Sequence, residues 1–576
     1  THFFNPPRYM PLLELVTTDA TNAGVREGLR HVCDVALGKK VIDCQDTPGF
    51  IGNRLGTLWI QVATNAAEDH DLTIEESDAL AGRHFGIPST GIFKLMDLVG
   101  LDLGPYVSKS LYDNVNQGDM FREEYRESKL LEGMIAEGYT GRKGKGGWYR
   151  LNKVDGQKVK EVKDLKTGEY RPVEKATGAA LAVSKKGARA VFEAGDKLAT
   201  AAWEYMSKYF VYAADHALDI ANSIFDVDEA MKTGYGFKWG PFELMDEVGP
   251  KWIVDKLREE GRSVPALLDA VGDGTFYKIE DGEHFFMLAD GSYTPVVRPE
   301  GVLLLSDIKR RSEPVMRNGS ASVWDIGDGV LCFEFTSMAN SLDEGTMTML
   351  GKTIATIDKS DDYKALVIHN EGKNFSVGAN IGLMLFASNI AAWPQVQSGI
   401  RGGQDVFMKL RFGNFPVVSA PSGIAVGGGC EILMHSDAVQ AHAETYTGLV
   451  EVGVGVMPGW GGCKEMIRRH LGNKRAPRGP MPALVKAFEL IGTAQVAKSA
   501  MEAQRDFLII NEDDTITFNK ERVLFDAKQR ALGMVEGYQP PEEETFRLPG
   551  ATGRAAIDMA LHDFNMKGMA SDYDVH

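Results

Sequence analysis

A ten-residue pattern occurs twice in this chain, and it constrains the fold more than any other feature of the sequence. Residues 91–100 read GIFKLMDLVG and residues 240–249 read GPFELMDEVG, so seven of ten positions are identical. Upstream, residues 74–80 (IEESDAL) match residues 225–231 (FDVDEAM), with an offset that differs by only two residues. A repeated segment of this kind indicates a duplicated structural unit. The apolar spacing is helical, so we expect two copies of one helical domain; chance similarity of two amphipathic helices is the alternative.

The N-terminal segment predicts a strand, a helix and a second strand. Residues 12–16 are apolar, residues 22–37 carry apolar side chains at helical spacing, and residues 41–42 form a second short apolar run. This order is typical of a parallel α/β sheet. No GxGxxG phosphate loop lies near it, and the chain opens on THFFNP without Met. We therefore expect a piece of a longer polypeptide, cut in mid-domain, whose phosphate loop precedes residue 1.

Two glutamates in glycine-rich surroundings are candidate catalytic groups. Glu431 closes the run GIAVGGGCE, and Glu451 lies twenty residues later in TGLVEVG. Glycine lets bare backbone approach a ligand closely. Two carboxylates near exposed backbone N–H groups can share one water as general acid and base, while the N–H groups hold a developing oxyanion. A lone Glu is usually a solvated surface residue, so two glutamates flanking ordinary loops is the alternative.

Beyond residue 315 the chain restarts with strands. Residues 322–335 predict a hairpin, a helix follows over 344–357, and strands follow at 365–369 and 416–420. This strand–strand–helix order predicts a stacked spiral of ββα units rather than a doubly wound sheet. Earlier in the chain, residues 274–298 predict a β-hairpin that turns at Asp281-Gly282. Residues 139–149 predict a basic loop that ends in a short strand, and residues 152–177 predict a polar linker or a hairpin.

Charge and cysteine usage exclude several classes of function. The formal charge of −17 and the isoelectric point near 5.3 argue against a general nucleic-acid binder. No apolar run in the sequence reaches the roughly 20 residues of a membrane span. The five cysteines form neither a CxxC pair nor a metal-ligand spacing, which indicates reduced thiols in a cytoplasmic protein. The sequence contains no secretory signal and no zinc, calcium or iron motif.

Two families resemble this chain in succession. Residues 320–530, with the motifs around the two glutamates, resemble the crotonase (enoyl-CoA hydratase/isomerase) family. Residues 1–300, through HFFNP and TPGFIGNR, resemble the C-terminal part of 3-hydroxyacyl-CoA dehydrogenase, and the order resembles bacterial fusions of fatty-acid β-oxidation. The resemblance implies an α/β and mainly-α multidomain protein: a Rossmann-sheet remnant (1–46), two all-helical dehydrogenase domains (47–152 and 191–315) joined by a linker (153–190), and a crotonase-type ββα spiral with a helical C-terminal extension (316–576).

In the crotonase-like part, the resemblance assigns a role to four residues. Ala379, in the run FSVGAN, and Gly428 supply the two N–H donors of an oxyanion hole for the thioester oxygen. Hydratases of the family keep both glutamates, whereas many isomerases keep only the later one. The presence of both Glu431 and Glu451 therefore favours hydration. Asn380 departs from the family, which usually has Asp there, and we expect it to shape the loop.

In the dehydrogenase-like part, the resemblance assigns His2 as the catalytic base, Glu14 as the carboxylate that orients it, and Asn53 as a substrate contact. A base with a pKa near 6.5 suits removal of the 3-hydroxyl proton as hydride leaves. NAD is the implied cofactor, and its site is largely missing from this chain, so we expect weak NAD binding or none. His2 lies one residue from the chain end, where disorder is the default, so we expect it not to be held in working geometry.

The leading interpretation is a β-oxidation enzyme that hydrates trans-2-enoyl-CoA to 3-hydroxyacyl-CoA and, in the full-length parent, oxidises that product with NAD. An enoyl-CoA isomerase and a non-catalytic acyl-CoA-binding scaffold are the alternatives. Acyl-CoA thioesters are the expected substrates, a thiolase and a second copy of the chain are candidate partners, and no metal is expected. Five basic residues could meet coenzyme A phosphates, although such a cluster is more often a solvated face: Lys373, Arg468, Arg469, Lys474 and Arg475.

Overall fold

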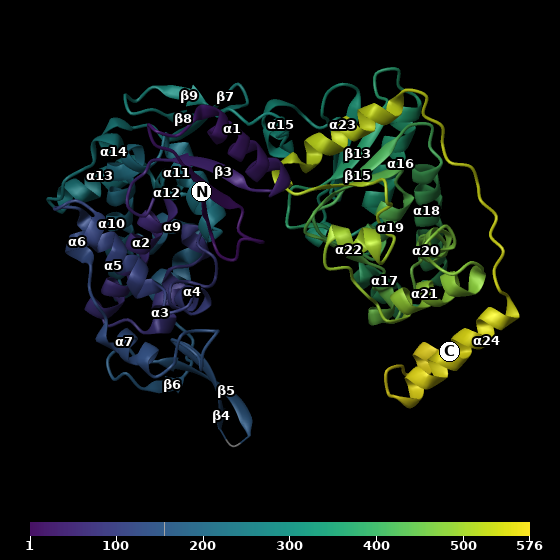
Figure 1. The fold of residues 1–576 in the computed structure, drawn as a ribbon, viewed down its shortest axis with the longest axis horizontal. Helices are drawn as coiled ribbons and strands as arrows, with labels where there is room; N and C mark the ends of the chain where they lie inside the picture. The colour runs from purple at the N-terminus through teal and green to yellow at the C-terminus, as the bar shows by residue number, and fades with distance from the viewer. Residues whose placement is uncertain (155) are drawn as a thin grey trace. The chain divides into compact units, whose positions relative to one another are not determined.

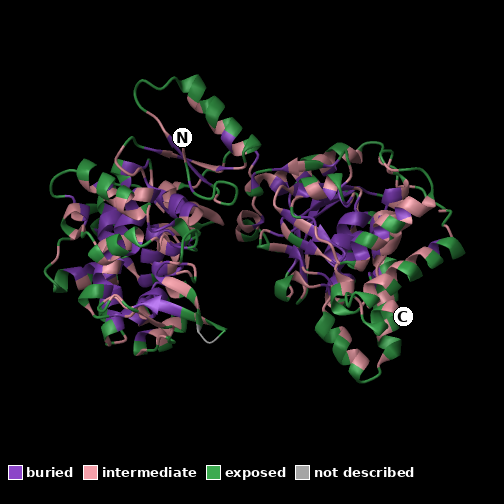
Figure 2. Cartoon of the chain, turned by 60° about the horizontal axis from the view of Figure 1, so that its bottom comes forward, coloured by how far each residue is buried: buried purple, intermediate pink, exposed green. Residues whose placement is uncertain are grey.

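The computed structural model describes residues 1–154 and 156–576, and the chain divides into two compact units (Figure 1). The first unit comprises residues 1–34 and 39–297, and the second comprises residues 35–38 and 298–576. In each unit the buried residues gather in the interior (Figure 2). The second unit begins at Arg298 rather than at the predicted residue 316, because Leu305 on α15 (Leu305–Arg311) is buried in the core of that unit.

A three-stranded sheet opens the first unit. It consists of β1 (His2–Phe3), β2 (Leu12–Val16) and β3 (Lys40–Cys44), with β1 antiparallel and β3 parallel to β2. Parallel strands need a crossover connection, and here it is α1 (Ala23–His31) followed by a π-helical turn (Val32–Ala36). The predicted order of strand, helix and strand is confirmed.

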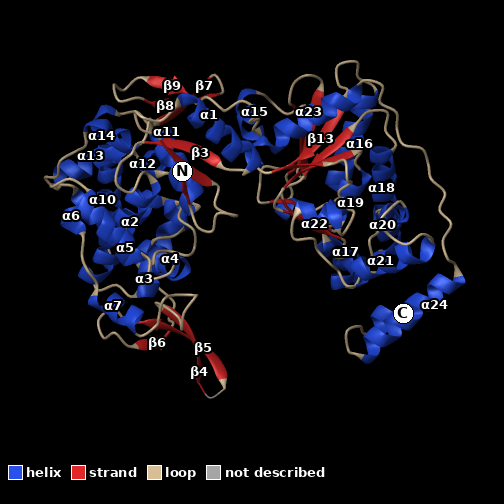
Figure 3. Ribbon diagram, in the orientation of Figure 1, coloured by secondary structure: helices blue, strands red, loops and turns tan. Residues whose placement is uncertain are grey.

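Helices make up most of the first unit (Figure 3). The first copy of the repeat contains α2 (Gly52–Asp69), α3 (Ile74–Leu80), α4 (Phe93–Val99), α5 (Gly104–Asn114), α6 (Met120–Glu124) and α7 (Lys129–Ala136), with a 3₁₀ turn at Arg83–Phe85. The second copy contains α10 (Lys197–Ile220), α11 (Ile224–Tyr235), α12 (Pro241–Val248), α13 (Pro250–Glu259) and α14 (Ala266–Ala270). Helix starts follow the sequence: Thr73 caps α3 through a reciprocal pair of hydrogen bonds with Glu76.

The same set of internal hydrogen bonds occurs in both copies and shows which of their residues are equivalent. In each copy a buried aspartate, Asp78 or Asp228, accepts two backbone amides at the start of a later helix and one tyrosine hydroxyl. The donors, all at 2.7 to 2.9 Å, are Ile92, Phe93 and Tyr149 in the first copy and Phe242, Glu243 and Tyr277 in the second. The repeat is therefore confirmed, but the sequence pairing of Asp78 with Glu229 is off by one residue. Pro241 has no N–H, so the second aspartate takes the next two amides.

Both copies build a single hydrophobic core. Helix α10 of the second copy packs along α2 of the first, and one continuous cluster of buried apolar residues runs through both. At Gly56, α2 lies against the second copy without room for a side chain, because a Cβ there would lie 1.8 Å from the hydroxyl of Tyr235. Because one apolar cluster runs through both copies, we expect the tandem to fold as one unit.

Each copy also carries a three-stranded antiparallel sheet, which the expectation of all-helical domains missed. The strands are β4 (Tyr149–Val154), β5 (Gln157–Lys163) and β6 (Tyr170–Pro172) in the first copy, and β7 (Tyr277–Glu280), β8 (Glu283–Met287) and β9 (Tyr293–Pro295) in the second. The predicted hairpin at Asp281 is confirmed, with β9 as a third strand.

The expected linker over residues 153–190 contains regular structure. Its first part forms β5 and β6, and its remainder forms α8 (Ala179–Val183), a 3₁₀ turn (Ser184–Lys186) and the start of α9 (Ala188–Phe192); residue 155 lies outside the described residues. Polar, lysine-rich composition did not decide between a linker and a hairpin. The first half of β5, with Lys158, is exposed, and its second half, with Val162, is buried.

The second unit is built on two sheets. The larger has the strand order β10-β11-β12-β13-β15-β17-β19, antiparallel up to β12 and parallel from β12 onward, and the smaller is the parallel set β14-β16-β18. The strands are β10 (Met316–Arg317), β11 (Ala321–Asp325), β12 (Val330–Phe335), β13 (Ala365–His369), β14 (Asn374–Ser376), β15 (Val417–Ala420), β16 (Gly423–Val426), β17 (Ala438–His442), β18 (Thr445–Gly448) and β19 (Thr515–Thr517).

From β13 onward the strands come in pairs, in which the first strand joins the larger sheet and the second joins the smaller sheet. Helices follow each pair, so the predicted ββα spiral is confirmed. The helices are α16 (Glu344–Asp358), α17 (Ile381–Asn389), α18 (Trp393–Arg411), α19 (Gly428–His435), α20 (Gly462–Leu471), α21 (Pro480–Gly492), α22 (Ala500–Arg505), α23 (Val523–Val535), α24 (Ala551–Met566) and α25 (Asp572–Val575), with 3₁₀ turns at Met338–Asn340, Glu451–Val454 and Lys520–Arg522. This arrangement brings the ends of β14, β16 and β18 together, where the candidate residues of the second unit lie.

Candidate active sites

The loop after β14 presents one backbone N–H without a protein partner. Gly378 has a φ of 87°, a left-handed conformation that glycine adopts without strain. Its carbonyl accepts the amide of Leu342 at 2.8 Å, and the amide of Asn380 donates to the Leu342 carbonyl at 2.9 Å. Between these two bonds, the N–H of Ala379 has no acceptor among the described residues. Asn380 caps α17 through its side-chain oxygen, in keeping with the expected role in shaping the loop.

The turn that begins α19 lies against this loop. A Cβ on Gly378 would lie 2.9 Å from the carbonyl oxygen of Val426 and 3.0 Å from the amide nitrogen of Gly428. The N–H of Gly428 is likewise without an acceptor in the part of the chain that the structure describes. The two predicted donors, Ala379 and Gly428, therefore belong to adjacent segments. Two such N–H groups converging on one point are the donor arrangement that an oxyanion site requires.

Glu431, on the first turn of α19, is buried and held at one oxygen. Its Oε1 accepts the amide of Trp460 at 2.9 Å and the amide of Gly462 at 2.8 Å, and the residue is only 1% exposed. A Cβ on Gly462 would lie 3.0 Å from that oxygen, so glycine is required for this contact. The two bonds fix the carboxyl group and leave Oε2 for a ligand.

Glu451 begins a 3₁₀ turn after β18 and lies beside the same glycine turn. Its Oε1 lies 3.4 Å from the position of a Cβ on Gly427, and a Cβ on Gly427 would also lie 3.7 Å from the Cα of Gly378. Its Oε2 is buried and has no hydrogen-bond partner among the described residues. A buried carboxylate oxygen without a partner is costly, and a bound ligand or water would satisfy it.

Burial and mutual repulsion shift the acidity of the two glutamates. Burial raises the pKa of Glu431 to about 7, and the negative charge of Glu451 adds to that rise. Burial also raises the pKa of Glu451. Like charges that share a site resist ionising together. The pair therefore holds one proton close to neutral pH, so one member can donate a proton while the other accepts one.

Two residues that sequence reasoning missed support this site. A Cβ on Gly428 would lie 2.8 Å from the ring of Trp460. That ring packs edge to face against Phe407. His435, one turn after Glu431, donates its Nδ1–H to the Glu431 carbonyl, 2.7 Å away, and is fully buried. The signal available in the sequence was an aromatic residue inside the glycine run PGWGG.

The basic residues proposed for coenzyme A phosphates do not form one exposed group. Arg469 is buried and donates to the carbonyls of Met434 and Leu508 and to the side chain of Asn511, so its assignment to phosphate binding is wrong. Arg468 is paired with the buried Glu465 at 2.8 Å. The remaining candidates are exposed on the surface of the unit, namely Lys373, Lys474 and Arg475.

In the first unit, one buried carboxylate connects the candidate dehydrogenase residues. Glu14 is fully buried, and its Oε2 lies 2.6 Å from Nδ1 of His2. Its Oε1 accepts the amides of Ile51 and Gly52 at 3.0 and 2.8 Å, at the start of α2. Asn53 is the next residue, so three separate motifs meet at one point. A carboxylate can only accept, so Nδ1 of His2 carries the proton and Nε2 carries the lone pair of a base.

The expectation that His2 would not be held in working geometry is wrong. β1 pairs with β2 in a register that places His2 opposite Glu14, and the imidazole ring lies between the rings of Phe4 and Phe50 at 5.0 and 5.7 Å. Strand pairing and a buried hydrogen bond therefore overcome the usual disorder of a chain end.

No cluster of three or more His, Cys, Asp or Glu side chains that could hold a metal ion occurs among the described residues. Within those same residues, no helix has the length and apolar character needed to cross a membrane.

Comparisons with known proteins agree with this division of the chain. Residues 1–47 match the NAD-binding domain of 3-hydroxyacyl-CoA dehydrogenase, residues 49–151 and 205–267 match the C-terminal domain of that enzyme, and residues 326–484 match enoyl-CoA hydratase/isomerase. A Bacillus subtilis protein named as a 3-hydroxyacyl-CoA dehydrogenase is 35% identical over all of this chain and 72% of its own length. A Rickettsia felis protein named as a fatty acid oxidation complex trifunctional enzyme is 32% identical over 82% of this chain and 62% of its own.

Among solved structures, an enoyl-CoA hydratase from Bacillus anthracis aligns with 43% of this chain and 82% of its own, with 20% identity and a TM-score of 0.30. Taken together, the fold, the two clusters of candidate residues and the matched families define a multifunctional enzyme that acts on acyl-CoA thioesters in fatty-acid β-oxidation. The chain belongs to the 3-hydroxyacyl-CoA dehydrogenase family, in the form that also carries an enoyl-CoA hydratase/isomerase domain. It spans between three fifths and three quarters of the length of these relatives.

Proposed function

We propose that the second unit hydrates trans-2-enoyl-CoA thioesters, with Glu431 and Glu451 as the acid–base pair. The observation that carries this proposal is that two unpaired amides, the buried Glu431 and the partly buried Glu451 lie around one glycine turn. Gly427 and Gly428 contribute bare backbone, and the Gly378 loop approaches them within contact distance.

The thioester oxygen would bind between the N–H groups of Ala379 and Gly428. As water adds to carbon 3, negative charge moves onto that oxygen, and fixed donors stabilise it more than they stabilise the neutral substrate. The ionised member of the glutamate pair takes a proton from water while the water oxygen bonds to carbon 3. The protonated member, which we assign as Glu431 because its pKa is raised to about 7, then gives a proton to carbon 2.

For the first unit, we propose that His2 removes the proton of the 3-hydroxyl group during oxidation of 3-hydroxyacyl-CoA. Glu14 fixes the ring and would stabilise the imidazolium that forms. Asn53, at the second position of α2, would hold the substrate through its amide group. When bound, NAD would supply the hydride acceptor, and residues 1–47 match the NAD-binding domain of 3-hydroxyacyl-CoA dehydrogenase.

Two further proposals concern a partner enzyme and the location in the cell. The Rickettsia felis protein is named as part of a fatty acid oxidation complex, which supports our proposal that this enzyme works with a thiolase that consumes the 3-oxoacyl-CoA product. We also propose a cytoplasmic location, which the five free cysteines support because thiols persist in reducing compartments.

The direct test supplies crotonyl-CoA and a 3-enoyl-CoA in parallel and identifies the products. A hydratase converts crotonyl-CoA into 3-hydroxybutyryl-CoA, whereas an isomerase only moves the double bond of the 3-enoyl substrate. We expect hydration to be the main activity. Isomerisation without hydration would replace this proposal with the isomerase alternative, and binding without either reaction would favour the non-catalytic scaffold.

A further inference from the structure

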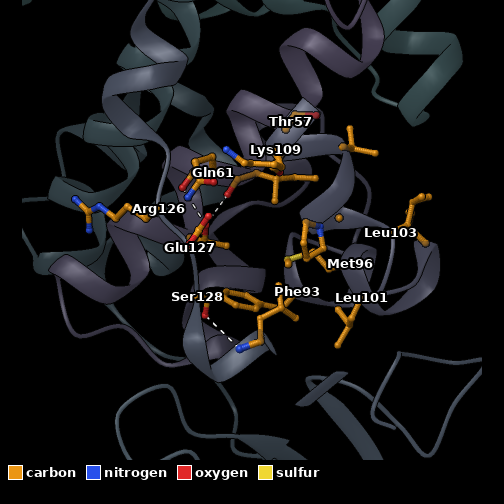
Figure 4. Close-up of a pocket in the computed structure, with 18 of the residues that line it drawn as sticks. Thr57, Gln61, Phe93, Met96, Leu101, Leu103, Lys109, Arg126, Glu127 and Ser128 are labelled. Carbon is orange, nitrogen blue, oxygen red and sulfur yellow. Dashed lines mark hydrogen bonds between the residues drawn. The ribbon is translucent and has the colours of Figure 1, made fainter. Parts of the chain in front are cut away.

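The helical tandem contains a cavity of about 650 Å³ that begins at the candidate substrate contact Asn53. This volume lies within the usual range of small-molecule sites, roughly 300–1,000 Å³. The residues that line it come from α2, from α4 and α5 and the turn between them, and from the segment that joins α6 to α7 (Figure 4). All of these elements belong to the first copy of the repeat, and Tyr235 of the second copy contributes at one point.

The cavity is an elongated groove that follows α2. The lining residues Asn53, Thr57, Gln61, Thr64 and Glu68 recur every three or four positions and therefore share one face of that helix. Fifteen residues separate the first from the last, which at 1.5 Å per residue is about 22 Å. A groove of this length leads away from the candidate dehydrogenase site along almost the whole helix.

The wall opposite α2 is apolar. It is formed by Met96, Val99, Leu101 and Leu103, of which Met96, Leu101 and Leu103 lie together in Figure 4. Val99 is 49% exposed and Leu103 42% exposed, although both belong to a well-formed helical region. Apolar side chains left open along a groove indicate a ligand that covers them.

Two polar side chains on the α2 wall are already satisfied within the protein. Gln61 donates to the side chain of Asn65 at 2.9 Å, and the hydroxyl of Thr64 donates to the carbonyl of Ile60 at 2.9 Å. These groups therefore need no polar partner from a ligand. An apolar chain can lie against them without leaving a hydrogen bond unmade.

Charge marks the far end of the groove. Arg126, which lines it, makes two hydrogen bonds to Asp69 at 2.8 and 2.9 Å. In Figure 4 the labels of Arg126 and Glu127 lie on the side away from Leu103. An apolar ligand chain gains no binding free energy by extending onto an ion pair. This end of the groove therefore sets the maximum length of the ligand chain.

We propose that this groove binds the acyl tail of 3-hydroxyacyl-CoA and makes the dehydrogenase site selective for long chains, of about sixteen carbons. The inference rests on the proposed oxidation of 3-hydroxyacyl-CoA at His2 and Asn53. An extended peptide backbone spans roughly 3.3–3.6 Å over the three bonds of one residue, and on that scale about 22 Å accommodates roughly 18 to 20 bonds of an extended acyl tail. A tail of about sixteen carbons therefore ends inside the groove. Each methylene that it buries should tighten binding roughly fourfold.

Photolabelling with the full chain tests the inference. The probe is 3-hydroxyhexadecanoyl-CoA with a diazirine on its last carbon, and the labelled peptides are mapped by mass spectrometry. We expect label on residues 61–68 or 126–131, at the far end of the groove. A four-carbon probe of the same design should label residues 53–57 instead.

Two neighbouring tryptophan variants provide the matched comparison. Val99 lines the groove and Leu98 does not, yet both lie on α4 and both are 49% exposed, so neither substitution disturbs the core. V99W should reduce labelling by the long probe at least tenfold and leave the four-carbon probe unaffected. L98W should label like the wild type.

The second unit also binds acyl-CoA under the proposed function, so label in residues 298–576 is an internal control. Label there without label in the groove overturns this inference and leaves the hydratase proposal standing. Equal loss of label in V99W and L98W also overturns it. A chain that takes no label in either unit and does not hydrate crotonyl-CoA overturns both proposals.

Discussion

Glu14 holds the imidazole of His2 with one carboxylate oxygen, at 2.6 Å, and the first amides of α2 with the other. This single side chain joins the strand that carries His2 to the helix that carries Asn53. The helix in turn forms one wall of the groove that leaves the site. The geometry of the candidate dehydrogenase residues therefore depends on one buried carboxylate.

Replacing Glu14 separates its two roles. E14A should lower the free energy of unfolding by about 2–4 kcal/mol, because the amides of Ile51 and Gly52 lose their acceptor inside the protein. E14Q should cost much less, since its amide oxygen still accepts them, but its NH₂ group would donate to Nδ1 and force the proton of His2 onto Nε2. Urea unfolding measures the first effect, and ¹⁵N shifts of the imidazole measure the second. Equal stability of E14A and wild type would contradict this account.

Gly378 should be essential for the rate of hydration but less so for folding. In G378A the new Cβ would meet the Gly428 amide at 3.0 Å and would occupy a left-handed conformation, so the loop would shift and separate the two oxyanion donors. We expect kcat to fall about a hundredfold, as when one such donor is lost. The matched control is G372A, where no atom lies within 4 Å of the added Cβ. A wild-type kcat in G378A would contradict the assignment of the Ala379 and Gly428 amides as oxyanion donors.

Hydration should lose activity above neutral pH. The raised pKa of Glu431, about 7, means that it keeps its proton up to that pH and loses it above. The form of the pair with one proton then declines tenfold per pH unit, and kcat/KM should decline with it. In E451Q the neighbouring charge is gone, so the pKa of Glu431 and the falling limb should move to lower pH.

The control for this pH profile is C463S. Cys463 lies close to both glutamates, and burial raises the pKa of its thiol to about 11, too high to produce the limb. Its replacement by Ser should leave the profile unchanged. A kcat/KM that stays flat from pH 7 to 9 in the wild type would be incompatible with a proton shared by the two glutamates.

The two copies of the helical repeat should not fold separately. Their buried apolar residues form one cluster, and α10 of the second copy packs along α2 of the first. Residues 190–300 expressed alone should expose that face and show no cooperative thermal transition, whereas residues 1–297 should melt in one step. A sharp melt of the isolated second copy, measured by circular dichroism and calorimetry, would show that its core is sufficient.

Periodicity and glycine motifs predicted the elements and the repeat, but not the contacts between distant segments. The ββα order predicted the spiral, and the run GGGCE located the turn of Gly428. Nothing in the sequence indicates that the amides of Trp460 and Gly462 hold Glu431, because these residues are some thirty positions away. The sequence alignment paired Asp78 with Glu229 instead of Asp228 because the two acids are adjacent and alike. The structure distinguishes them, since Asp228 accepts the two amides that follow Pro241, which has no N–H.

Composition misled where structure depends on pairing. Residues 157–163 are rich in lysine and left a linker and a hairpin equally open, yet β5 pairs on both sides and buries Val162. His2 at the chain end predicted disorder, yet β1 pairs with β2. In both cases tertiary hydrogen bonds override a local preference that is weak on its own.

The most direct test of the central claim compares crotonyl-CoA hydration by the wild-type chain, E431Q and E451Q, followed as the loss of absorbance of the conjugated double bond. Glutamine keeps the size of each side chain but cannot exchange a proton. We predict that both variants keep the wild-type melting temperature within a few degrees and that each loses at least about a hundredfold in kcat. Wild-type-like hydration by either variant would contradict the two-carboxylate mechanism.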